Sequence, residues 1–238
     1  MIVKSNVLAY VISTTAIFLL IVVFLLTAIE LVAFDTRFYR NEYRKLDRPT
    51  AIGISEEELM EVTRELLGYI KGKRPDLNIT ATIKGQERPV FNQREIDHMI
   101  DVRVLFERGY ILRTILVIAL FLSLLVLYYI VRMNIFRYLF RSFVFLFIFL
   151  FVVFGILYIL INMDFTRYWG YFHYIFFDND LWQLDPRADV LIQMVPEKFF
   201  YDMVVRIMVY FITGVVVMGA LLGYLSARLS GGKKYRLG

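Results

Sequence analysis

Four long apolar runs alternate with polar connections along the chain. The runs cover residues 6–34, 109–133, 139–163 and 203–229. Each run is long enough to cross a bilayer as one helix, which takes about 20 apolar residues. The pattern therefore predicts an all-α polytopic membrane protein with four transmembrane helices, forming a single integral membrane domain over all 238 residues.

The polar connections differ in length and in charge. Residues 35–108 and 164–202 form two long connections, whereas residues 134–138 form a short turn and residues 230–238 a short tail. All 22 acidic residues lie within residues 30–107 and 164–202, and the short turn and the tail carry basic residues without any acid. Because short basic segments stay in the cytoplasm, we expect both termini inside the cell and both long connections outside.

The first long connection contains signals for two helices and a hairpin. Residues 55–58 read Ser-Glu-Glu-Glu, a capping box that predicts a helix running to about Tyr69. Residues 78–84 alternate like a strand and end in a turn, which predicts a short β-hairpin. A second cap signal at residues 92–95 starts a helix that we expect to continue into the second apolar run.

The second long connection combines large aromatic side chains with acids. Such aromatic rings suit the headgroup layer, so residues 164–202 are expected to form short interfacial helices. A calcium site is one interpretation of the acids that follow His173, but their spacing lacks the glycine and glutamate of an EF-hand. We expect these acids to orient an imidazole or to pair with arginines instead. They are Asp178, Asp180, Asp185 and Asp189.

The two histidines are the candidate catalytic residues. His98 and His173 each lie just outside an apolar run, on the same predicted side of the membrane. Asp101 follows His98 by one helical turn, where a carboxylate can orient a general base. We expect the imidazoles to lie within about 12 Å of each other, facing a groove open to lipid. The chain has no cysteine and no serine elbow, which favours direct transfer over an acyl-enzyme.

Charged side chains near the apolar runs should have partners. Arg113 and Arg206 lie within the second and fourth runs, where an unpaired charge costs about 3 kcal/mol. We expect one of them to pair with an acid, with Glu30 and Asp202 as first choices. The candidate substrate-binding residues are Arg113, Arg206, Trp182, Asp180 and Asp189.

Two stretches resemble the bacterial lipoprotein intramolecular transacylase family, Lit. They are EIDHMIDV at residues 95–102 and YFHYIFFDNDLW at residues 171–182, continued by residues 184–186, Asp189, residues 194–197 and residues 199–200. The four-span layout and the loop sizes also agree, so the resemblance covers nearly the whole chain. It implies an enzyme of the bacterial cell membrane with its active site on the extracytoplasmic face.

The resemblance implies a specific reaction on diacylglyceryl-modified lipoproteins. The sn-2 acyl chain of the diacylglyceryl group moves to the α-amino group of the same N-terminal cysteine, giving a lyso-form lipoprotein. His98 is the first choice for the base and His173 for the proton donor, although the order can be reversed. We expect no cofactor and no metal, contact with membrane lipids, and a monomer.

Other function classes fit the sequence less well. A non-catalytic four-span protein could use its aromatic outer loops to bind a partner. A transporter is disfavoured because the apolar runs carry few central polar groups. The net charge of +5 does not indicate nucleic-acid binding, because no basic aromatic groove is visible.

Overall fold

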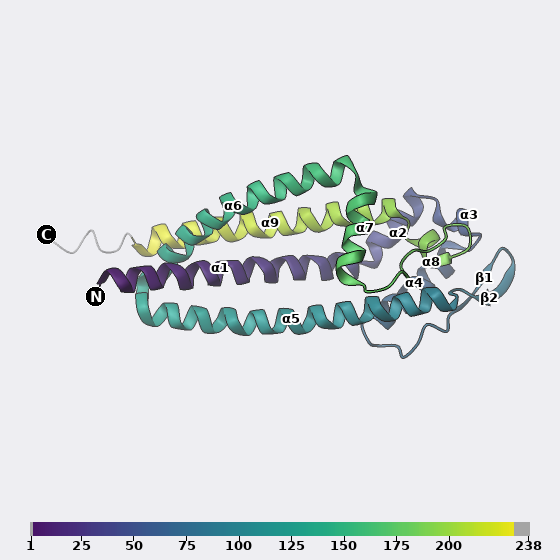
Figure 1. The fold of residues 1–238 in the computed structure, drawn as a ribbon, viewed down its shortest axis with the longest axis horizontal. Coiled ribbons are helices and arrows are strands. Elements are labelled where there is room, and N and C mark those ends of the chain that lie inside the picture. Colours follow the sequence, from purple (N-terminus) through teal and green to yellow (C-terminus); the bar gives the residue numbers. More distant parts are fainter. Residues whose placement is uncertain (1, 231–238) are drawn as a thin grey trace. The chain divides into compact units, whose positions relative to one another are not determined.

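The computed structural model describes residues 2–230, and side chains of residues 6–229 (Figure 1). Within this range the chain divides into two compact units. The helical unit contains the residues up to Ile29, Ile111–Asn162, and those from Ile207 onward; the loop unit contains Glu30–Tyr110 and Met163–Arg206. The basic tail predicted at residues 230–238 lies outside the described residues, apart from Ser230 at the end of the last helix.

Long helices build the helical unit. Its described elements are parts of α1 (Ile2–Ala33), α5 (Gln93–Val131) and α9 (Glu197–Ser230), together with η1 (Arg132–Asn134) and α6 (Ile135–Met163). Three segments of the described chain are long and apolar enough to span a membrane: Asn6–Ala33, Gln93–Met163 and Glu197–Leu229. The predicted membrane-spanning character is therefore supported, while the count of four crossings stays a prediction.

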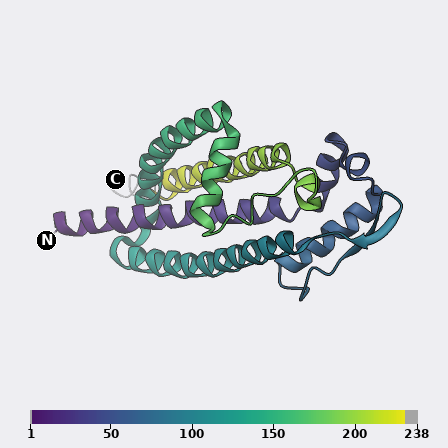
Figure 2. The ribbon, with the colours of Figure 1, turned by 45° about the vertical axis from the view of Figure 1, so that its right-hand side comes forward.

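The second segment contains a reversal of the chain. At η1 the backbone of Arg132 adopts φ +50°, which a right-handed helix cannot accommodate. After this residue α6 runs in the direction opposite to the adjoining part of α5 (Figure 1, Figure 2). The two apolar runs predicted on either side of residues 134–138 thus correspond to two separate helices.

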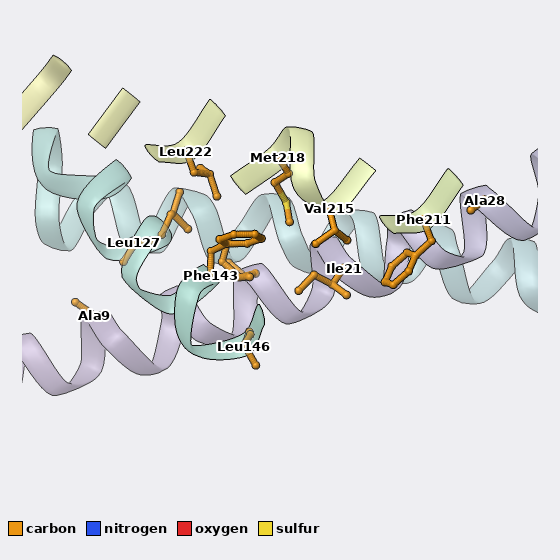
Figure 3. Close-up of a cluster of buried hydrophobic side chains, with 13 residues drawn as sticks. Ala9, Ile21, Ala28, Leu127, Phe143, Leu146, Phe211, Val215, Met218 and Leu222 are labelled. Atoms are coloured by element: carbon orange, nitrogen blue, oxygen red, sulfur yellow. The ribbon is translucent and has the colours of Figure 1, made fainter. Parts of the chain in front are cut away.

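A buried apolar cluster holds the helical unit together. Its buried residues come from all four long helices, and most are labelled in Figure 3. Small and medium side chains such as Ala16 on α1 let the backbones approach closely, while Phe143 and Phe211 fill the space between helices. The buried residues are Ala9, Ala16, Ile17, Ile21, Ala28, Leu127, Leu139, Phe143, Leu146, Phe211, Val215, Met218 and Leu222.

Hydroxyl groups link α1 to α6 inside the same unit. The hydroxyl oxygens of Ser13 and Ser142 lie 2.7 Å apart, and Thr14 donates to the Ser142 oxygen at 3.1 Å. Ser13 and Ser142 are both buried. In an apolar environment such bonds add to packing as a source of helix association.

Short elements build the loop unit and confirm the predicted local structure. Ser55 accepts a hydrogen bond from the Glu58 amide at 3.1 Å and caps α4. The predicted hairpin is also present, and its turn uses Lys84 and Gly85 at φ +51° and +78°. The elements are α2 (Thr36–Lys45), α3 (Arg48–Ile52), α4 (Glu56–Ile70), β1 (Thr80–Ile83), β2 (Gln86–Pro89), α7 (Phe165–Phe176) and α8 (Val190–Met194).

Aromatic side chains form the centre of the loop unit. Phe199, in the first turn of α9, is fully buried and lies 6.2 Å from the ring of Tyr43 on α2. Phe38 and Tyr39 of α2 also contact Phe199, at ring distances of 5.2 and 5.0 Å. This contact fixes the end of the second long connection, residues 164–202, against the first.

Replacing Gly219 with alanine should destabilise the helical unit. A Cβ atom at Gly219 would overlap the ring of Phe143, which is buried and must move. Overpacking of this kind costs about 1–3 kcal/mol, and thermal unfolding in detergent measures it. The control is Gly155→Ala on α6, where nothing lies within 4 Å and helix propensity alone favours alanine. Equal melting temperatures for the two variants would contradict the close α6–α9 packing.

Candidate active site

A buried capping box starts α5 and reaches across the loop unit. The Glu95 carboxylate accepts a hydrogen bond from the Asn92 amide at 2.7 Å, and the Asn92 side chain accepts one from the Glu95 amide at 3.1 Å. The other Glu95 oxygen accepts a hydrogen bond from the backbone amide of Leu191, in α8, at 2.6 Å. Glu95 is only 1% exposed, and burial raises the pKa of its carboxyl group above the ordinary value.

A second carboxylate strengthens the same connection. Asp189 precedes α8, is buried, and accepts a hydrogen bond from the Asn92 side chain at 2.7 Å. It also accepts one from the Asp185 amide at 2.6 Å. The predicted substrate-binding residue Asp189 therefore holds the second long connection against the start of α5 in this structure.

The two histidines come together from different elements of the loop unit. His98 lies on the polar first turns of α5, outside the apolar run, and His173 lies on α7. Their ring centroids are 6.3 Å apart at an interplanar angle of 38°, and both side chains are buried. The proximity predicted from the sequence is confirmed, well inside the limit of about 12 Å for groups that act on one substrate.

Hydrogen bonding fixes the orientation and the tautomer of His173. Its Nδ1 lies 2.8 Å from the carbonyl oxygen of Trp169, one helical turn earlier. Because a carbonyl oxygen only accepts, Nδ1 must carry the hydrogen, and Nε2 of the neutral ring keeps its lone pair. The indole of Trp182 stacks on the imidazole at 4.5 Å, and Trp169 meets it edge-on at 4.7 Å.

The His98 imidazole is buried and forms fewer hydrogen bonds than that of His173 among the described residues. Its Nδ1 is buried and has no hydrogen-bond partner within the part of the chain that the structure describes. Phe177 packs against the ring at 5.3 Å. Burial, with a smaller effect of nearby His173, lowers the pKa of His98 to about 4. Burial also lowers the pKa of His173, although its bond to Trp169 opposes the change. Both rings are therefore neutral near pH 7.

Asp101 contacts a different group from the one expected. Its carboxylate accepts a hydrogen bond from the Asn179 side chain at 2.8 Å, whereas Nδ1 of His98 has no partner among the described residues. The backbone carbonyl oxygen of Asn179 in turn accepts a hydrogen bond from the indole N–H of Trp182 at 3.1 Å. Asp101 thus reaches His173 through Asn179 and Trp182, a path that no sequence spacing indicated.

The remaining predicted binding residues lie in several places. The backbone oxygen of Asp180 accepts a hydrogen bond from Arg94, and its carboxylate is 3.6 Å from the same guanidinium. Arg113 belongs to the helical unit. Trp182 lies directly on His173. Among the described residues, no three side chains of His, Cys, Asp or Glu gather to hold a metal ion.

Arg206 confirms that an arginine near the apolar runs pairs with an acid. It donates to Asp35, the N-cap of α2, at 2.9 Å, and its guanidinium lies 5.2 Å from the Phe38 ring. Asp202, one of the two acids first expected, forms ion pairs with Lys45 and Lys198 at 2.7 Å each. Asp35 is thus one acid partner of Arg206, and the sequence did not single it out.

Removing the Glu95 carboxylate should loosen the α5–α8 connection. Glu95→Ala leaves the amides of Asn92 and Leu191 without their acceptor, which should lower the free energy of unfolding by about 2–3 kcal/mol. The control is Asp97→Ala, a neighbouring acid whose one hydrogen bond within the described residues, from Gln93, is exposed. Thermal melting in detergent compares the two variants. An equal decrease of the melting temperature in both would contradict the role of Glu95.

The depressed pKa of His98 predicts an acid-sensitive fold. The unfolded chain binds a proton near the ordinary histidine pKa of about 6.5, whereas folded His98 binds one only near about 4. Stability should therefore be complete above about pH 6.5 and fall as the pH drops toward 4. His98→Gln should flatten this part of a plot of melting temperature against pH. An unchanged slope would show that His98 ionises normally.

Comparisons with known proteins give a family and a similar fold. The family model described as lipoprotein intramolecular transacylase Lit matches residues 14–200. The fold is similar to that of the membrane integral lipoprotein intramolecular transacylase Lit from Bacillus cereus, with a TM-score of 0.75 and 18% identity over 94% of this chain and 98% of that chain.

A variant of the Bacillus cereus protein with a histidine-to-alanine mutation gives a TM-score of 0.71 at 17% identity, over 95% of this chain and 97% of that chain. None of the curated proteins matches the sequence. Since the family model covers most of the chain, this membrane protein belongs to the lipoprotein intramolecular transacylase (Lit) family.

Proposed function

We propose that this protein moves the sn-2 acyl chain of a diacylglyceryl lipoprotein to the α-amino group of its own N-terminal cysteine. The observation that carries the proposal is the pair of buried imidazoles of His98 and His173, 6.3 Å apart, in a chain of the Lit family. The ester that donates the acyl chain and the amine that accepts it belong to one substrate molecule. The enzyme therefore needs to supply orientation and proton transfer, but no nucleophile.

The reaction requires two proton movements. The neutral amine attacks the ester carbonyl carbon, a C–N bond forms, and a base takes the proton from nitrogen. The tetrahedral intermediate carries negative charge on the former carbonyl oxygen, which a hydrogen-bond donor stabilises. The C–O bond to the glyceryl group then breaks, and the departing oxygen gains a proton. The products are an amide and a free sn-2 hydroxyl group on the same lipoprotein.

The hydrogen bonds favour His173 as the base. Its Nδ1 is committed to the Trp169 carbonyl, which leaves the Nε2 lone pair to accept a proton and stabilises the imidazolium that results. The pKa of His98 is lowered further, so that ring stays neutral. A neutral imidazole can still donate a hydrogen bond to a developing oxyanion. This order is the reverse of the one first favoured from the sequence.

The same proposal includes a location for the reaction. The basic turn and the acidic long connections support four crossings with both termini in the cytoplasm. The loop unit, with both histidines, then lies on the extracytoplasmic side of a bacterial cell membrane. The substrate's acyl chains stay in the lipid while its N-terminal cysteine contacts the histidines. A monomer surrounded by membrane lipids is sufficient for this reaction.

Alanine at either histidine should abolish transfer without unfolding the protein. Loss of acid–base catalysis lowers a rate by about 10² to 10⁴. Asp101→Asn should cause a smaller loss, because it weakens the bond to Asn179 without removing a reacting group. Mass spectrometry of the N-terminus of a co-expressed lipoprotein measures conversion, and thermal melting in detergent checks folding.

The matched control for the aspartate is Asp97→Asn, on the same two turns of α5, which should convert lipoprotein normally. Wild-type conversion by either alanine variant would remove that histidine from the mechanism. An unmodified lipoprotein in the presence of folded wild-type protein would instead favour a non-catalytic protein that binds a partner through its outer loops.

A further inference from the structure

A basic pocket lies between α2 and α4 of the loop unit. Its volume is about 390 Å³, and half of its six lining residues are arginines. Two arginines come from α2 and one from α4, so the pocket depends on how these helices pack. None of its residues is among those that contact the two histidines. The lining consists of Thr36, Arg37, Arg40, Asn41, Met60 and Arg64.

Two acids that contact arginines of the pocket also have other cationic partners. Asp35 accepts from Arg206 at 2.9 Å and lies 3.5 Å from the Arg37 guanidinium. Glu56 accepts two hydrogen bonds from Arg44, at 2.7 and 2.8 Å, and lies 3.7 Å from Arg40. Each acid is thus shared by two arginines, and the positive charge of the pocket is only partly neutralised.

Arg64 is the pocket cation with the most capacity to bind a ligand. It is exposed and forms no hydrogen bond or ion pair with any residue that the structure describes. Glu61 precedes it by less than one turn of α4, yet the two form no ion pair within 4.0 Å in the described chain. Arg37 lies 3.5 Å from Asp35 through Nε, and 91% of its side chain is exposed to solvent, so its terminal N–H groups remain accessible to a ligand.

The donor chemistry of the pocket matches a phosphate group. Guanidinium groups bind phosphate oxygens through paired N–H donors, and the phosphodiester of a lipid headgroup offers its ester oxygens as weak acceptors besides its anionic oxygens. The Asn41 amide and the Thr36 hydroxyl add neutral donors to the same wall. Three arginines from two helices can therefore surround one phosphate, which an isolated surface arginine cannot do.

The position of the pocket in the chain indicates the source of that phosphate. The apolar segment Asn6–Ala33 ends three residues before Thr36, the first residue of α2. The start of α2 therefore follows directly where the chain leaves the hydrocarbon layer, at the depth of lipid headgroups. Anionic lipids attract basic residues at this depth.

We propose that the α2–α4 pocket binds the phosphate group of an anionic membrane lipid. Full-length protein in detergent should retain phosphatidylglycerol in native mass spectrometry, in preference to phosphatidylcholine. Arg64→Gln should weaken retention by about tenfold, as expected for one lost charge-assisted contact. Arg37→Gln combined with Arg64→Gln should weaken it further. Parallel titrations with inorganic phosphate and glycerol phosphate distinguish a lipid headgroup from a free anion.

The matched control is Arg88→Gln combined with Lys73→Gln, which removes the same charge from exposed residues outside the pocket. This control should retain phosphatidylglycerol like the wild type. Arg64 has no partner in the described chain, so its single replacement tests the site even if the double variant unfolds, which thermal melting reports. Equal lipid retention by Arg64→Gln and the wild type, or equal loss in the control, would overturn the proposal. Binding of inorganic phosphate alone would overturn the lipid source.

Discussion

The arrangement of the loop unit depends on one buried carboxylate, that of Glu95. It closes the first turn of its own helix through Asn92 and reaches the backbone of Leu191 in α8. Burying a carboxylate is unfavourable unless hydrogen bonds replace its hydration, and backbone amides supply those bonds here. Because His98 lies one turn further along α5, the bond that starts the helix also sets where that imidazole lies relative to the second long connection.

The histidines share an environment that keeps both rings uncharged. Phe177 and Trp182 exclude water from one side, and two neutral imidazoles 6.3 Å apart do not repel each other. Weak competition from water strengthens any hydrogen bond to a developing oxyanion. A site built this way suits a substrate that carries both the electrophile and the nucleophile, since the protein then needs only to orient it and to transfer protons.

Local signals predicted local structure well. The capping boxes at Ser55 and at residues 92–95 and the turn at Lys84 depend on neighbours a few residues apart, and all three are present in the structure. The closeness of the histidines was also predictable, because the pattern of apolar runs and charges predicted both on one side of the membrane. The caps and the turn depend on residues close together in the sequence, and the placement of the histidines followed from the predicted topology.

The partners of individual side chains were less predictable. Helical spacing places Asp101 near His98, but Asn179 comes from a loop that sequence periodicity cannot position. Asp35 and Arg206 are 171 residues apart in the chain, so no local pattern indicates that they pair. The α2–α4 pocket likewise depends on how two helices pack, and the sequence does not specify that packing.

The hydroxyl contact between Ser13, Thr14 and Ser142 has a consequence for how α1 and α6 face each other. One residue of an α-helix corresponds to a rotation of about 100°. A rotation of α6 by that amount about its own axis would point the Ser142 hydroxyl away from α1. Apolar side chains alone tolerate many such rotations, because hydrocarbon contacts are not directional. The three hydroxyl groups, together with the hydrogen bonds from Tyr138 to Asn6 and from Arg141 to Tyr10, thus fix the rotation of α6 relative to α1.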